Sequence, residues 1–141
     1  MHRREFITLA AATGLTAFAP PAQAAYLAIQ YVPGLIRDLQ SGGGTLIVNF
    51  SATWSLTSQI KRDAISQMKQ DNPDYSANIT FVDVDWDTYG PSEMARRLKV
   101  QRHATLIALQ GREEVARLVA EIDERRIKAF LDQTLAAALS R

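Results

Sequence analysis

The spacing of apolar residues along the chain predicts four helical segments. Apolar positions recur at helical spacing in three of them, and Ser92 predicts the N-cap of a fourth, shorter one. Pro33-Gly34 predicts a break in the first helix, and Asn72-Pro73 ends the second because the residue before proline avoids helical backbone angles. Asp123 predicts the N-cap of the last. The predicted helices cover residues 26–40, 56–71, 92–98 and 123–139.

Four other segments have the pattern of β-strands. Three are short continuous apolar runs, typical of strands buried on both faces of a sheet, and the fourth alternates as a half-exposed strand does. Gln110-Gly111-Arg112 predicts a tight turn between the last two. The predicted strands cover residues 45–50, 79–84, 105–109 and 115–119. Helices and strands in this order predict one α/β domain with a mixed central sheet flanked by helices on both faces.

The first 24 residues have the composition of an export signal. Arg3-Arg4 precedes an apolar run from Phe6 to Ala19, and Ala22-Gln23-Ala24 forms a small-x-small cleavage site. The run is too short to span about 30 Å of hydrocarbon comfortably. The arginine pair resembles the twin-arginine export motif, and an ordinary secretory signal is the alternative. We predict a signal peptide over residues 1–24, a domain over residues 25–141 in the periplasm or otherwise exported, and no stable membrane span after signal removal.

Composition and charge favour a folded domain that binds no nucleic acid. Apolar residues make up 47% of the chain and charged residues 22%, as in globular proteins. Removing Arg3-Arg4 and Glu5 leaves equal numbers of basic and acidic residues, so the strong basic excess of nucleic-acid-binding proteins is missing. One local basic cluster remains, and we interpret it as a solvated helix face. It consists of Arg96, Arg97, Lys99 and Arg102.

The sequence contains no cysteine, which limits the chemistry of the chain. Without thiols it cannot form disulfides, exchange them with other proteins or hold a metal through cysteine. Its two histidines, His2 and His103, cannot build a histidine-rich metal site. We therefore expect no metal and no cofactor.

Three segments resemble the thioredoxin family. Residues 48–58, with Trp54 before a helix start, resemble the family's strand and active-site turn, where a tryptophan precedes a Cys-x-x-Cys pair. Residues 81–85 resemble the family's third strand, and residues 98–106 resemble the segment that carries its cis-proline. The resemblance runs from Thr45 to the C-terminus. It implies the thioredoxin fold and membership of a family of thiol–disulfide oxidoreductases.

The departures from the family fall on the residues that carry its chemistry. Ser55 and Ser58 stand at the two cysteine positions, and a serine hydroxyl stays protonated and forms no mixed disulfide. Ala104 stands at the cis-proline position. A cis bond before alanine would cost about 3–4 kcal/mol, so we predict a trans His103–Ala104 bond. Asn49 stands at the position of a buried aspartate found in part of the family, and it cannot relay a proton.

The resemblance leaves three functions open. In the first, the protein is a redox-inactive binding or assembly module for a periplasmic protein or peptide. The family's substrate groove then implies binding by Trp54, His103, Ala104 and Thr105. In the second, the chain is the inactivated, Cys-to-Ser form of an oxidoreductase, with Ser55 and Ser58 at its catalytic positions. In the third, Ser55 is a nucleophile and His103 its base. For Trp86 we expect only packing against the sheet.

Overall fold

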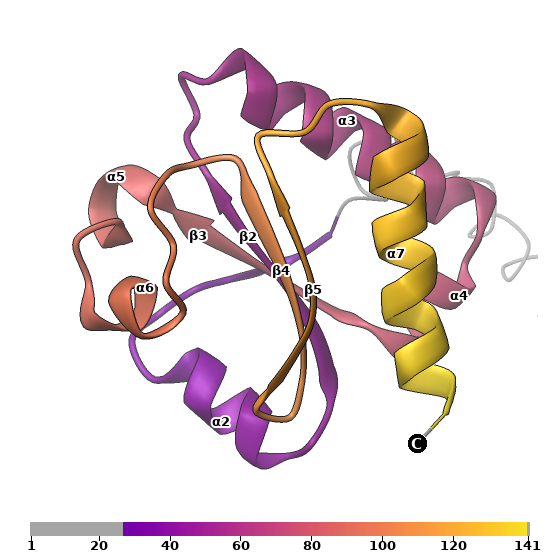
Figure 1. Cartoon of the computed structure of the whole chain (residues 1–141), viewed down its shortest axis with the longest axis horizontal. Helices are drawn as coiled ribbons and strands as arrows, with labels where there is room; N and C mark the ends of the chain where they lie inside the picture. The colour runs from indigo at the N-terminus through magenta and orange to yellow at the C-terminus, as the bar shows by residue number, and fades with distance from the viewer. Residues whose placement is uncertain (1–26, 141) are drawn as a thin grey trace, which may run out of the picture.

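The computed structural model describes residues 27–140, so the predicted signal and its Arg3-Arg4 pair lie outside the described residues. The described part of the chain forms a mixed five-stranded sheet with the order β1-β3-β2-β4-β5 (Figure 1). None of the helices in this part is long and apolar enough to cross a membrane. The strands are β1 (Ile29–Gln30), β2 (Thr45–Ser51), β3 (Thr80–Asp85), β4 (Thr105–Gln110) and β5 (Glu113–Val119).

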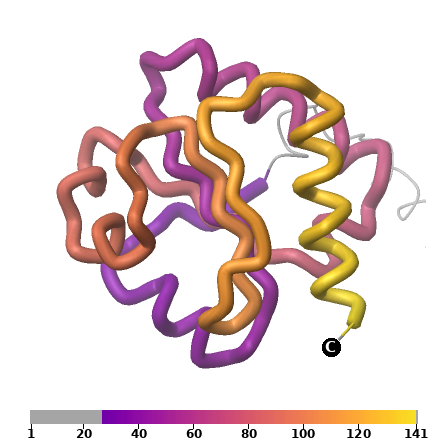
Figure 2. The backbone as a smooth tube through the Cα atoms, in the orientation of Figure 1, coloured from indigo at the N-terminus to yellow at the C-terminus, as the bar shows by residue number. Residues whose placement is uncertain are grey.

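The sheet combines a parallel and an antiparallel half. β3 runs parallel to both β1 and β2, whereas β4 runs antiparallel to β2 and to β5. Figure 2 traces the chain through β2 at the centre and out to the β4–β5 hairpin. Gly111 closes that hairpin with a left-handed φ of 56°, which glycine adopts without the steric cost of a side chain. The three central strands are buried almost throughout, as their apolar runs predict.

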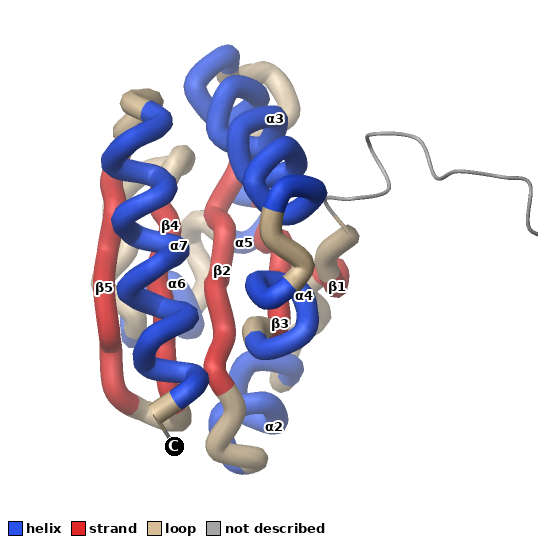
Figure 3. The backbone as a smooth tube through the Cα atoms, turned by 90° about the vertical axis from the view of Figure 1, so that its right-hand side faces the viewer, coloured by secondary structure: helices blue, strands red, loops and turns tan. Residues whose placement is uncertain are grey.

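Helices cover both faces of the sheet (Figure 3). On one face pack α3 (Leu56–Asp71), α4 (Asp74–Asn78) and α7 (Glu124–Leu139). On the other face pack α2 (Leu35–Ser41), α5 (Trp86–Tyr89) and α6 (Glu93–Arg97). Alternate β2 residues serve the two cores: Ile47 faces the first, while Val48 and Phe50 face the second. The predicted α/β class and the helices on both faces are confirmed.

The prediction for residues 26–40 is wrong in its first half. A helix begins only at Leu35, after the predicted break at Pro33-Gly34. Upstream, Ile29 and Gln30 form the edge strand β1 and pair with β3. The pairing partner decides this conformation, because two residues are too few to show a strand pattern of their own.

The predicted helix caps are confirmed, and two short helices were missed. Ser92 caps α6 by accepting from Ala95 N–H at 3.2 Å, and Asp123 caps α7 by accepting from Arg125 N–H at 2.9 Å. The helices α4 and α5 are too short to leave a periodic signal. Trp86 packs edge-on against Phe50 at 6.4 Å, as expected for a residue that packs against the sheet.

Candidate functional site

Trp54 lies on the turn between β2 and α3 and projects from it. Its side chain is 64% exposed, yet it is held from two sides. The indole N–H donates to both carboxylate oxygens of Asp87 in α5 at 3.0 Å, and the His103 ring packs edge-on at a centroid distance of 4.8 Å. A large apolar surface is therefore presented to solvent in a fixed orientation.

Ser55 and Ser58, which the sequence resemblance aligns with a pair of cysteines, are turned inward. Ser55 is the N-cap of α3: its hydroxyl oxygen accepts from Ser58 N–H at 3.2 Å. The Ser58 hydroxyl oxygen in turn accepts from Ala52 N–H at 3.2 Å, which ties the turn to the helix. Both residues are only 4% exposed. The hydroxyls thus satisfy backbone donors, which is a structural role.

The loop before β4 is shaped around alanine at position 104. The described residues contain no cis peptide bond, so the predicted trans His103–Ala104 bond is confirmed. Ala104 has a left-handed φ of 61°, which costs a non-glycine residue about 1 kcal/mol or more. Two backbone bonds hold it there: Ala104 N–H donates to Phe50 O at 2.7 Å, and Ala104 O accepts from Ala120 N–H at 2.8 Å.

A buried lysine also supports this loop. The Lys61 side chain on α3 is fully buried, and its ammonium donates to the Ala104 carbonyl oxygen. Burial lowers the pKa of Lys61 to about 8, with Arg102 lowering it further and Glu121 raising it. The loop is therefore held by a lysine whose charged form is disfavoured by burial.

Asn49 has a carboxylate beside it that the sequence pattern did not indicate. Its side-chain amide donates to the buried Asp83 carboxylate at 3.3 Å, because Asn49 and Asp83 stand opposite each other in the β2–β3 pairing. Arg62 on α3 closes the group with an ion pair to Asp83 at 3.0 Å. The carboxylate is thus neutralised by a neighbouring guanidinium.

The structure brings the predicted site residues to one edge of the molecule but exposes few of them. Ala104 and Thr105 are buried, and the Thr105 hydroxyl donates to Arg102 O at 2.8 Å, so neither side chain is free to meet a partner. His103 is partly exposed, and its Nδ1 is buried with no hydrogen-bond partner. Of the four predicted binding residues, Trp54 and His103 are thus the two that present a surface.

Further apolar side chains at this edge were missed by sequence reasoning. Leu56, two residues after Trp54, is 69% exposed, although it belongs to the apolar spacing that predicts a helix over residues 56–71. Val119 is 47% exposed and stands opposite Thr105 in the β4–β5 pairing. Val119 and Thr105 also help to line a groove of about 650 Å³. Leu56 at the start of α3 and Val119 at the end of β5 therefore add exposed apolar area to this edge.

No metal-binding arrangement is found in residues 27–140: no three histidine, cysteine, aspartate or glutamate side chains lie close enough together to hold an ion. What the site offers chemically is the exposed Trp54 indole, held by Asp87 and His103, and two buried serine hydroxyls that hold the turn together.

No protein-family model and no curated protein sequence matches the chain. Solved structures do match it. Trxlp from Edwardsiella tarda superposes with a TM-score of 0.64 at 18% identity, over 74% of this chain and 98% of that one. The thioredoxin Mala s 13 of Malassezia sympodialis superposes with a TM-score of 0.64 at 17% identity, over 77% of this chain and 95% of that one. The thioredoxin NaTrxh of Nicotiana alata superposes with a TM-score of 0.63 at 19% identity, over 84% of this chain and 97% of that one. At these identities the likeness concerns the fold, and this chain has the thioredoxin fold.

Proposed function

We propose that this protein is an exported thioredoxin-fold module that binds a periplasmic protein or peptide and carries out no thiol–disulfide exchange. One observation carries the proposal. At the family's reactive positions the Ser55 and Ser58 hydroxyls are buried and occupied by backbone donors, whereas Trp54 beside them is exposed and held in place. The turn retains a surface for recognition and has lost the group for reaction.

The loop at Ala104 supports long divergence rather than a recent loss of cysteines. Proline fixes φ near −65° and has no N–H, so it fits neither the φ of 61° nor the bond from Ala104 N–H to Phe50 O. The backbone here fits alanine, and proline would fit only if the loop rearranged. A thioredoxin-like enzyme inactivated only at its cysteines would have no reason for such a loop.

The exposed groups indicate what kind of partner this edge would bind. Trp54 and Leu56 offer apolar area, and Trp54 loses little side-chain entropy on binding because Asp87 and His103 already hold it. Aromatic residues of this kind are common binding hot spots. A protein or peptide segment with an apolar side chain fits this surface best.

The alternative function is that of an oxidoreductase inactivated by Cys-to-Ser replacement. The observation in its favour is that Ser55 and Ser58 keep the spacing and the helix N-terminus that would stabilise a thiolate. A hydrolytic role for Ser55 has less support. The Ser55 hydroxyl accepts from Ser58 N–H, and it makes no hydrogen bond with His103.

Restoring the cysteines separates the two main functions. We expect the double variant Ser55→Cys/Ser58→Cys to fold, and to reduce insulin disulfides in the presence of dithiothreitol no faster than a thioredoxin-free control. The reason is that Asn49 cannot relay a proton and the loop at Ala104 lacks the family's proline. Ser58→Cys alone is the matched control, since it has one thiol and cannot cycle. Strong turnover by the double variant would favour the inactivated enzyme.

A further inference from the structure

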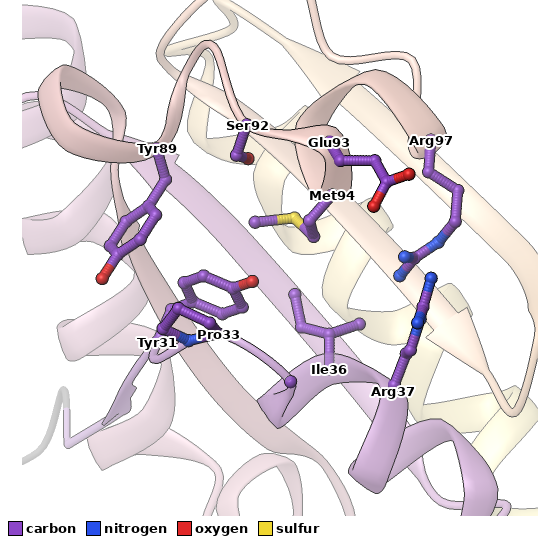
Figure 4. Close-up of a pocket in the computed structure, with 10 residues that line it drawn as sticks. Tyr31, Pro33, Ile36, Arg37, Tyr89, Ser92, Glu93, Met94 and Arg97 are labelled. Carbon is purple, nitrogen blue, oxygen red and sulfur yellow. The ribbon is translucent and has the colours of Figure 1, made fainter.

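We propose a second binding site, separate from the Trp54 turn, for a carboxylate attached to an apolar group (Figure 4). It lies between α2 and the α5–α6 segment, in a pocket of about 310 Å³. Neither Trp54 nor the two serines contributes to it, so this inference does not depend on the proposed function.

Two arginines mark the anionic end of the site. Arg37 on α2 and Arg97 on α6 extend toward one another across the mouth of the pocket (Figure 4). Within residues 27–140 neither guanidinium forms an ion pair. The two positive charges repel each other, and an anion bound between them would be attracted to both. Guanidinium groups bind carboxylates through paired N–H donors, which makes arginine well suited to this role.

The other end of the pocket is apolar. Tyr31 and Tyr89 form its wall and meet edge to face at a centroid distance of 4.8 Å. Ile36 and Met94, 1% and 6% exposed, form its floor. A ligand whose carboxylate lies between the arginines can therefore place an aromatic or aliphatic side chain against these residues.

The charges around the pocket favour a single negative charge. Arg37 and Arg97 also line an adjoining hollow of about 530 Å³, to which Arg112 adds a third guanidinium. Glu93 is the acidic residue of the pocket lining, and it forms no ion pair in the described part of the chain. The pocket itself is lined by two guanidinium groups and one carboxylate, a net charge of +1, so a carboxylate matches it better than a phosphate dianion. The C-terminal residue of a polypeptide and a free apolar acid share this chemistry.

The test titrates the full-length protein with N-acetylphenylalanine and measures the NMR chemical shifts of the α2 and α6 backbone amides. We expect saturable shifts there, and no such shifts with N-acetylphenylalanine amide, which lacks the carboxylate. Arg37→Gln and Arg97→Gln should each weaken binding about tenfold or more, the loss expected for one charge-assisted contact. Glu93→Gln should strengthen binding, because it removes the repelling charge.

Arg125→Gln is the matched control. It removes one positive charge from α7, on the opposite face, where the side chain is 93% exposed, and it should leave binding unchanged. Equal binding of the amide, equal weakening by Arg125→Gln, or no shifts at α2 and α6 would overturn the proposal. Acetyl-Gly-Gly-Phe with a free C-terminus tells a polypeptide end from a free apolar acid. If this peptide binds as tightly as N-acetylphenylalanine, the ligand is a polypeptide C-terminus. If the peptide does not bind, the ligand is a free acid.

Discussion

Replacing Lys61 by methionine should stabilise the protein at neutral pH. Lys61 is fully buried, and its ammonium donates a hydrogen bond to Ala104 O and forms no ion pair within residues 27–140. Burial lowers its pKa from the ordinary 10.5 to about 8, which corresponds to about 3 kcal/mol of lost stability at pH 7. The hydrogen bond lost in the variant offsets about 1 kcal/mol. Methionine is unbranched and apolar, so we expect a net gain of about 2 kcal/mol.

The pH dependence of the gain identifies its cause. Above pH 8 the folded protein releases the Lys61 proton, while the unfolded chain keeps it until about 10.5. The unfolded state then binds more protons, so the stability of the unchanged protein rises with pH across this interval. Lys69, whose pKa burial also lowers to about 8, contributes equally to both proteins and cancels. The advantage of Lys61→Met should therefore be present at pH 7 and be lost by pH 10.5, where the missing hydrogen bond to Ala104 leaves the variant slightly less stable than the unchanged protein.

Urea denaturation of both proteins at pH 7 and pH 10.5 measures this difference. Lys128→Met is the matched control, because Lys128 is an exposed lysine on α7 with a 2.7 Å ion pair to Asp132. It should change the free energy of unfolding by less than about 0.5 kcal/mol. Destabilisation by Lys61→Met at pH 7, or a gain of the same size at both pH values, would refute the reasoning.

Two further predictions concern the backbone at Gly90 and the export signal. Gly90→Ala should destabilise the fold by about 1–3 kcal/mol in urea denaturation, because its Cβ would lie 2.7 Å from the Trp86 carbonyl oxygen and 2.9 Å from the indole. Gly44→Ala meets nothing within 4 Å, and a loss equal to that of Gly90→Ala would contradict the argument. Replacing Arg3-Arg4 by two lysines should leave the precursor in the cytoplasm, and fractionation that finds it efficiently exported would exclude the twin-arginine route.

The sequence predicts the central fold because long buried elements leave a clear pattern. β2 and α3 have enough apolar positions to show their period, and Asn72-Pro73 ends α3 as expected. β1 leaves no such pattern, since pairing with β3 decides its conformation. α3 also shows the limit of periodicity: Leu56 is exposed and Lys61 is buried, contrary to their polarity.

The candidate site could be predicted only where neighbouring residues form it. Trp54, Ser55 and Ser58 are found from one motif. The contact of Trp54 with Asp87 spans 33 positions, and that of Lys61 with Ala104 spans 43. Such contacts depend on how the sheet brings its strand ends together, which apolar spacing does not reveal. The same holds for the pocket that Arg37 and Arg97 share.

Photo-crosslinking from position 54 tests the central claim, that this thiol-free domain binds a partner through its Trp54 edge. A photoreactive phenylalanine replaces Trp54 in the full-length protein, expressed in its native host. The control carries it at Arg125, an exposed position on α7. The proposed function predicts a discrete crosslinked protein from position 54 and none from position 125. The same adducts from both positions, or no adduct from position 54, would contradict it.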